Sequence, residues 1–319
     1  MNRELEKSIC LGTGIPFVFL ILLISVPNCF VLIVLYRNPL RCFRKPFSVF
    51  LVFIAAVDLF NGVVVCCGGA VTRLLCAFGV GNFPQEGETM MILGYMGVNS
   101  SILLVTAMSV DPFIAVVYPH FYLRKVQPQK LAFSNAIICV FSSIFASLQL
   151  TGISMDIYHL MDRHLHTTFP LVTTVLAYFG IFFFLKKGSR VDVQRQTIST
   201  RNPPLYDLRY LRIAKSERKF LTTSFFILLF LIISIIPYFL VGSLEAKCRN
   251  RRNQGWLFMF RETSIEFLFV NSAVNPFLTT LRNNELKQSA KIVLGLRRQL
   301  SQGDVRLRTC GQPNEYVQS

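Results

Sequence analysis

Charged residues, histidine and tryptophan are scarce in this sequence. It has one Trp, four His and a charged share of 16% against a hydrophobic share of 52% in 319 residues. A soluble domain places more charge between its apolar runs, so this composition favours an integral membrane protein. Three of the histidines, His159, His164 and His166, cluster in one predicted outer loop. They are a candidate metal site, although ordinary loop positions explain them as well, and an enzyme is the function with the least support.

The cysteines show no regular spacing. Nine of them without a pattern predict neither a disulfide framework nor a metal site. Four lie inside apolar runs and are interpreted as small packing residues: Cys29, Cys66, Cys67 and Cys139. Internal repeats are also missing, which argues against a transporter, because many transporters are built from inverted repeats.

Long apolar runs are what the sequence has in abundance. Each has about 20 residues, which is the length of helix that crosses about 30 Å of hydrocarbon. Backbone groups in hydrocarbon must satisfy their own hydrogen bonds, so these runs are predicted to be helices. The predicted spans are 15–36, 47–71, 89–117, 131–153, 167–185, 220–242 and 257–281.

Basic residues predict the orientation of the seven spans. Most of the 33 Lys and Arg lie in the first, third and fifth connecting segments and in the C-terminal tail. The positive-inside rule therefore predicts a plasma-membrane protein with its N-terminus outside and its C-terminus in the cytoplasm. The formal charge of +16 fits contacts with anionic membrane lipids better than contacts with nucleic acid. The expected organisation is an extracellular tail at 1–14, a membrane domain at 15–294 and a cytoplasmic tail at 295–319.

A few polar residues lie at membrane depth. Asp58 is in the middle of the second run, where a carboxylate costs at least about 2.5–3.5 kcal/mol unless it faces partners inside the bundle. Ser101 lies in the third run, and Asn271 and Asn275 share a face of the seventh, four residues apart. A packing Asp that is simply hydrogen-bonded is one interpretation. A charged oxygen with several neutral oxygens also suits a small hard cation.

Two motifs resemble the rhodopsin-like (class A) G-protein-coupled receptors. The third run ends in Asp111-Pro112-Phe113 followed by Tyr118-Pro119, and the seventh contains Asn275-Pro276 with an amphipathic stretch downstream. Weaker matches to the family's helix positions are Asn28, Asp58, Pro170, Tyr178, Glu217 and Pro237. The resemblance implies an all-α integral membrane protein, a seven-transmembrane helix bundle with a short amphipathic eighth helix at 284–298. It also implies a small extracellular ligand, a heterotrimeric G protein as partner, and no cofactor beyond an allosteric sodium ion at Asp58, Ser101, Asn271 and Asn275.

The sequence departs from the family pattern at its signalling end. Pro112 stands where the family has the arginine that meets the G protein, and it predicts a kink or fraying near residues 108–112. Glu217 occupies the position of that arginine's partner. The other departures are Gly87 and a loop 154–168 without Cys in place of the family's disulfide, Gly94 in place of the aspartate of amine receptors, Ile235 in place of tryptophan, and Thr279 in place of tyrosine.

Three functions are compatible with these observations. The first is a receptor that senses an extracellular ligand and couples to a G protein through switch positions Asp111, Pro112, Phe113, Tyr178, Glu217, Pro237, Pro276 and Thr279. The second is a receptor-fold protein with lost or altered coupling, acting as a decoy, a chaperone-like partner or an arrestin-biased sensor. The third is a transporter or channel with Asp58 on an ion path.

Overall fold

The computed structural model describes residues 3–41, 43, 46–80, 88–196, 229–230, 232–244 and 255–296. Helices dominate these residues, and they contain no strand. The elements are α1 (Arg3–Arg37), α2 (Pro46–Phe60), η1 (Asn61–Cys66), α3 (Cys67–Ala77), α4 (Glu88–Val117), α5 (Pro119–Lys125), α6 (Pro128–Ser147), η2 (Leu148–Thr151), α7 (Met155–Arg163), η3 (His164–Thr168), α8 (Phe169–Gln196), the helix Ile232–Leu244, α10 (Gly255–Arg282) and α11 (Asn284–Val293).

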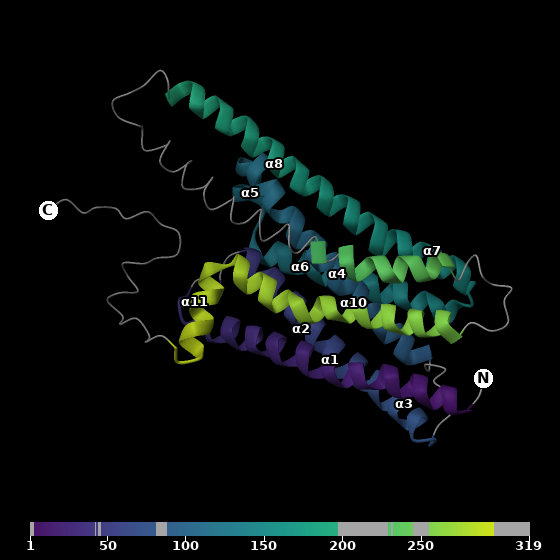
Figure 1. The fold of residues 1–319 in the computed structure, drawn as a ribbon. Helices are drawn as coiled ribbons and strands as arrows, with labels where there is room; N and C mark the ends of the chain where they lie inside the picture. The colour runs from purple at the N-terminus through teal and green to yellow at the C-terminus, as the bar shows by residue number, and fades with distance from the viewer. Residues whose placement is uncertain are drawn as a thin grey trace.

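The helices form a bundle with two distinct ends. Figure 1 shows the N-terminus, α3 and α7 at one end of the bundle, and α5 and α11 at the other. Five helical segments are long and apolar enough to cross a membrane: Glu6–Arg37, Pro46–Ala77, Thr89–Val117, Pro128–Thr151 and Met155–Phe184. The predicted sixth span, 220–242, is described only in part, by the apolar helix Ile232–Leu244. The predicted seventh span is α10, whose polar and charged residues lower its mean hydropathy.

Two predicted boundaries differ from the structure. The first helix begins at Arg3, so most of residues 1–14 continues α1. The fifth span begins at Met155, because α7, η3 and α8 follow one another without a break. Residues 155–168 are therefore helical, and the predicted histidine loop is wrong. His159 lies in α7, while His164 and His166 lie in the π-helical turn η3. The described residues contain no His, Cys, Asp or Glu cluster that could hold a metal ion.

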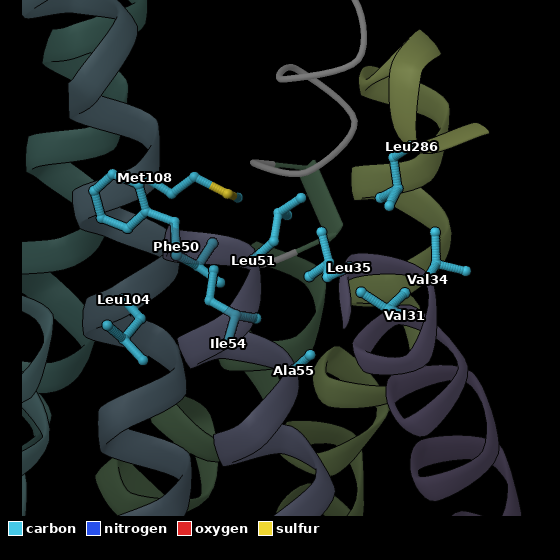
Figure 2. Close-up of a cluster of buried hydrophobic side chains, with 11 residues drawn as sticks. Val31, Val34, Leu35, Phe50, Leu51, Ile54, Ala55, Leu104, Met108 and Leu286 are labelled. Atoms are coloured by element: carbon cyan, nitrogen blue, oxygen red, sulfur yellow. The ribbon is translucent and has the colours of Figure 1, made fainter. Parts of the chain in front are cut away.

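The core at the α11 end joins four helices. Val31 and Val34 of α1, Phe50, Leu51 and Ile54 of α2, Leu104 and Met108 of α4, and Leu286 of α11 are buried against one another (Figure 2). The predicted eighth helix is thus present as α11, capped by the Asn283 side chain, which accepts from the amides of Glu285 and Leu286. Its buried face is Leu286, Ser289 and Ile292. Leu294 follows the helix end and is exposed.

A disulfide closes the opposite end of the bundle. Cys10 of α1 pairs with Cys76 of α3, 66 residues away in the chain, with their Cα atoms 6.0 Å apart. The prediction of no disulfide framework did not foresee this single bond, because Cys10 reaches Cys76 only when α1 extends well beyond its apolar run. Gly87, at the position of the family's usual cysteine, lies outside the described residues. The four cysteines predicted as packing residues, Cys29, Cys66, Cys67 and Cys139, are free thiols.

Candidate functional site

Asp58 is the centre of a polar cluster inside the bundle. Its side chain is fully buried in α2. Ser101 of α4 donates its hydroxyl to one carboxylate oxygen at 2.7 Å, and Asn275 of α10 donates its amide to the other at 2.8 Å. Two of the three predicted partners of Asp58 therefore meet it. The third, Asn271, is buried one turn earlier on α10 and hydrogen-bonds with none of the described side chains.

A second layer of polar residues surrounds this cluster. Ser272 lies close enough to Asp58 to interact with the carboxylate. Its hydroxyl accepts from the Asn61 amide at 3.3 Å, and its backbone carbonyl accepts from Asn28 at 3.1 Å. The side-chain oxygen of Asn61, Oδ1, is buried and has no hydrogen-bond partner in the described part of the chain. A buried acceptor in this state costs about 1–3 kcal/mol, so it marks a place where a donor or a cation would fit.

The donor set around Asp58 fits a small cation. One carboxylate is surrounded by neutral oxygen-bearing side chains, and its described contacts include no Lys or Arg. Hard cations prefer oxygen ligands of this kind. A buried carboxylate without a compensating charge is also unfavourable, which adds to the fit.

A cavity of about 680 Å³ lies beside this cluster, towards the end of the bundle that carries α3 and α7. Most of its wall is apolar and comes from α1, η1, α4 and α10: Phe17, Val65, Met90, Val98, Ile102, Ile265 and Phe269. Gly94, which stands where amine receptors carry an aspartate, also lines it. A cavity of this size and character is typical of a small-molecule site.

Two polar chains cross the cavity wall between α4 and α7. In the first, the Tyr95 hydroxyl lies 3.1 Å from His159 Nδ1 and 3.2 Å from the Tyr238 hydroxyl. In the second, the buried Asp162 carboxylate accepts from Asn99 at 2.8 Å and lies 3.0 Å from His166 Nδ1. These chains give an otherwise apolar cavity fixed hydrogen-bonding groups on one side.

The opposite side of the cavity holds a buried ion pair. Arg73 of α3, 1% exposed, pairs with Glu262 of α10. The guanidinium also lies 4.5 Å above the Phe17 ring of α1 and donates to the Gly69 carbonyl. Three helices therefore meet at Arg73. The predicted second span ended at residue 71, so this arginine was expected in an outer loop.

The fraying predicted near Pro112 is not found. Helix α4 continues through Pro112 to Val117 without fraying. Proline removes one amide donor, here the one opposite the Met108 carbonyl, but a packed neighbour can hold the helix together. That neighbour is α8: a Cβ added at Gly180 would lie 2.3 Å from the Phe113 ring, so the ring occupies the space that the glycine leaves.

Asp111 has a partner on the short helix α5. The Tyr122 hydroxyl donates to both carboxylate oxygens, at 3.1 and 3.0 Å. Burial raises the pKa of the Tyr122 phenol, and the Asp111 carboxylate raises it further. The phenol therefore keeps its proton at neutral pH and links the end of α4 to α5 in the absence of the family's arginine.

The other predicted switch residues are distributed along three helices. Tyr178 of α8 buries a hydroxyl that has no partner among the described residues. Pro237 lies in the helix Ile232–Leu244, and Pro276 lies inside α10. Thr279 donates to its own helix, to the carbonyls of Asn275 and Pro276 at 2.8 and 3.1 Å. Glu217 lies outside the described residues.

A bundle of apolar helices with a buried polar cluster and a cavity towards one end is the architecture of a multi-pass membrane protein. The family of the "7 transmembrane receptor (rhodopsin family)" matches residues 27–278, and the chain belongs to this family. It is therefore a multi-pass protein of the plasma membrane and a receptor rather than an enzyme.

Comparison with curated proteins identifies distant relatives. The uracil nucleotide/cysteinyl leukotriene receptor of Homo sapiens is 26% identical over 184 residues, covering 49% of this chain and 47% of the relative. The Mas-related G-protein coupled receptor member H of Mus musculus is 30% identical over 99 residues, covering 30% of this chain and 27% of the relative. The chain thus spans about half the length, or less, of these relatives.

Sequence reasoning missed Asn61, Ser272, Arg73 and the Asp162 chain. Asn61 carried a signal, because it follows Asp58 by three residues and so shares its helix face. Ser272 and Asp162 had no such signal, since their partners lie on other helices.

Proposed function

We propose that the protein is a G-protein-coupled receptor that binds a small extracellular ligand in the outer cavity. The observation that carries this proposal is that one turn of α4 belongs both to the cavity wall and to the polar cluster. Asn99 and Ile102 line the cavity, and Ser101 between them donates to Asp58. A ligand that moves this turn therefore also changes the polar cluster, which gives the bundle a route from its outer end to its middle.

The cavity end of the bundle faces outwards in this proposal. The positive-inside rule assigns the C-terminus and α11 to the cytoplasm. The N-terminus, α3 and α7 lie at the other end (Figure 1). Asp111, Tyr122 and α5 then face the G protein. The helix Ile232–Leu244 can bend at Pro237, and α10 can bend at Pro276.

The cavity suits a ligand with an apolar body and a polar or charged head. The apolar wall accepts the body, while the Tyr95 and Asp162 chains offer hydrogen bonds. Arg163 and Arg261 also line the cavity and supply positive charge. Uracil nucleotides and cysteinyl leukotrienes, which give one relative its name, are the first compounds to test, with nucleotide exchange on a panel of heterotrimeric G proteins as the readout.

A sodium ion at Asp58, Ser101, Asn271 and Asn275 is the second part of the proposal. When bound, the ion supplies the positive charge that the buried carboxylate lacks. Ser101 and Asn275 orient that carboxylate from α4 and α10, so the three helices are held together around it. In the rhodopsin-like family such an ion favours the inactive arrangement.

Replacing Asp58 with asparagine should abolish stabilisation by sodium. A ligand at a hundred times its dissociation constant stabilises a folded protein by about 2.7 kcal/mol, so the melting temperature of the wild type should rise with sodium concentration. Asp58→Asn removes the charge that attracts the ion, and its melting temperature should not respond. The measurement is thermal unfolding of purified protein in NaCl against choline chloride at constant ionic strength.

Asp162→Asn provides the matched control, because it neutralises another buried carboxylate of the bundle. It should retain the sodium response of the wild type. A wild-type response in Asp58→Asn would show that the ion does not bind at this carboxylate.

Pro112 favours a second candidate, a receptor-fold protein with lost or altered G-protein coupling. The family uses an arginine at this position to meet the G protein, and proline offers neither charge nor a hydrogen-bond donor. The Asp111–Tyr122 hydrogen bonds then hold the end of α4 in place.

Pro112→Arg should raise basal nucleotide exchange on at least one G protein severalfold. The new guanidinium restores the missing contact group, whereas Pro112→Ala restores only the backbone amide. If the arginine variant reaches the membrane and its basal exchange equals that of Pro112→Ala, the missing arginine is not what limits coupling.

A further inference from the structure

Asn61 occupies an unusual position between two spanning helices. It is the first residue of the π-helical turn η1, three residues after Asp58, and it is fully buried. A Cβ built on Gly97 of α4 would lie 1.8 Å from Asn61 Oδ1 and 2.9 Å from its Cγ. The carboxamide therefore fills the space that any larger residue at position 97 would need.

The backbone at this point is held from the other side as well. A Cβ at Gly62 would lie 2.5 Å from Ser25 Oγ and 3.0 Å from Ile24 of α1. Two adjacent residues thus pack in close contact with two different helices, Asn61 over α4 and Gly62 against α1. Small residues allow such close approach in membrane bundles. The position of the Asn61 side chain is consequently fixed.

The two ends of the Asn61 carboxamide have different surroundings. Its Nδ2 donates to the Ser272 hydroxyl at 3.3 Å, and Ser272 lies beside the Asp58 carboxylate. Its Oδ1 accepts no hydrogen bond from the described residues. A neutral oxygen with both lone pairs available is therefore held beside Gly97 of α4, on a residue that follows Asp58 by three positions.

We propose that Asn61 Oδ1 is an oxygen ligand of the cation at Asp58, and that Gly97 makes room for it. This inference rests on the proposed cation site and adds a residue that the family resemblance did not supply. Asn61 tunes the affinity of the site, while Asp58 provides its charge. A role in hydrogen-bonding Ser272 alone is the competing explanation, and it predicts no effect on cation affinity.

The test is a sodium titration of the thermal stability of the full-length protein, with choline chloride keeping the ionic strength constant. Asn61→Leu keeps the volume of the side chain but removes the oxygen, and it should weaken the apparent sodium affinity about ten- to a hundredfold, the range seen when groups around metal sites are removed. Gly97→Ala leaves every polar group in the chain and should weaken it similarly, by displacing the carboxamide. The double variant should have the same apparent sodium affinity as Asn61→Leu alone, because both changes remove the same contact.

Each outcome separates this inference from the cation site itself. The role of Asn61 is overturned if both Asn61→Leu and Gly97→Ala keep the wild-type sodium affinity while Asp58→Asn does not respond to sodium. That result leaves the cation site intact. A wild-type response in Asp58→Asn overturns both. Should Asn61→Leu fail to fold, Gly97→Ala decides the question: reduced affinity supports the role of Asn61, and unchanged affinity refutes it.

Discussion

Glu262→Gln should destabilise the protein by about 3–5 kcal/mol, the usual cost of removing one member of a buried ion pair. The change takes away the carboxylate that pairs with the Arg73 guanidinium, whose side chain is 2% exposed. Water cannot replace that carboxylate readily at such a depth. The measurement is the free energy of unfolding from a denaturing-detergent titration in mixed micelles.

Two further variants make this result specific. Glu4→Gln removes a carboxylate from an exposed pair with Lys7 at 3.6 Å, and exposed pairs contribute at most about 1 kcal/mol. Arg73→Met combined with Glu262→Leu should recover much of the loss, because apolar residues of similar volume often replace a buried pair without penalty. Equal stability of Glu262→Gln and the wild type would mean that Glu266, one turn further along α10, takes over as the partner of Arg73.

Cys10→Ser should cost about 2–4 kcal/mol, the typical contribution of a disulfide. The Cys10–Cys76 bond closes a 66-residue separation and ties α1 to α3, three residues beyond Arg73 of the cavity wall. A reducing agent should lower the melting temperature of the wild type towards that of Cys10→Ser and leave the variant unchanged. Thermal unfolding with and without dithiothreitol measures both.

Cys29→Ser is the matched control, since Cys29 is an exposed free thiol of the same helix. Its stability and its response to reduction should equal those of the wild type. If reduction leaves the wild-type melting temperature unchanged while the thiols become reactive, the bond adds no stability.

Much of the bundle was predictable because hydrocarbon leaves the chain few options. Apolar runs of sufficient length must be helices, and a carboxylate such as Asp58 must turn inwards and find partners. Ser101 and Asn275 were identified on that ground, and both donate to Asp58. The fold and the centre of the polar cluster therefore follow from local sequence.

The features that were missed depend on pairings between distant segments. Arg73 and Glu262 are 189 residues apart, and each looks like a charge near the end of a span until the fold brings these two side chains together. Cys10 and Cys76 meet only because α1 continues well beyond its apolar stretch. The space above Gly97 is defined by Asn61 of another helix, so a glycine in an apolar run carried no sign of it.

The π-helical turn η1 sets the direction, around the helix axis, in which the later side chains of the second spanning helix point. A π turn holds one residue more than an α turn, and one residue of an α-helix corresponds to about 100° of rotation. Without that extra residue, the part of the helix beyond η1 would be turned by about a quarter of a circle. Arg73 would point away from α10, and Cys76 away from α1. One inserted residue in the turn that begins three residues after Asp58 therefore aligns both the ion pair and the disulfide.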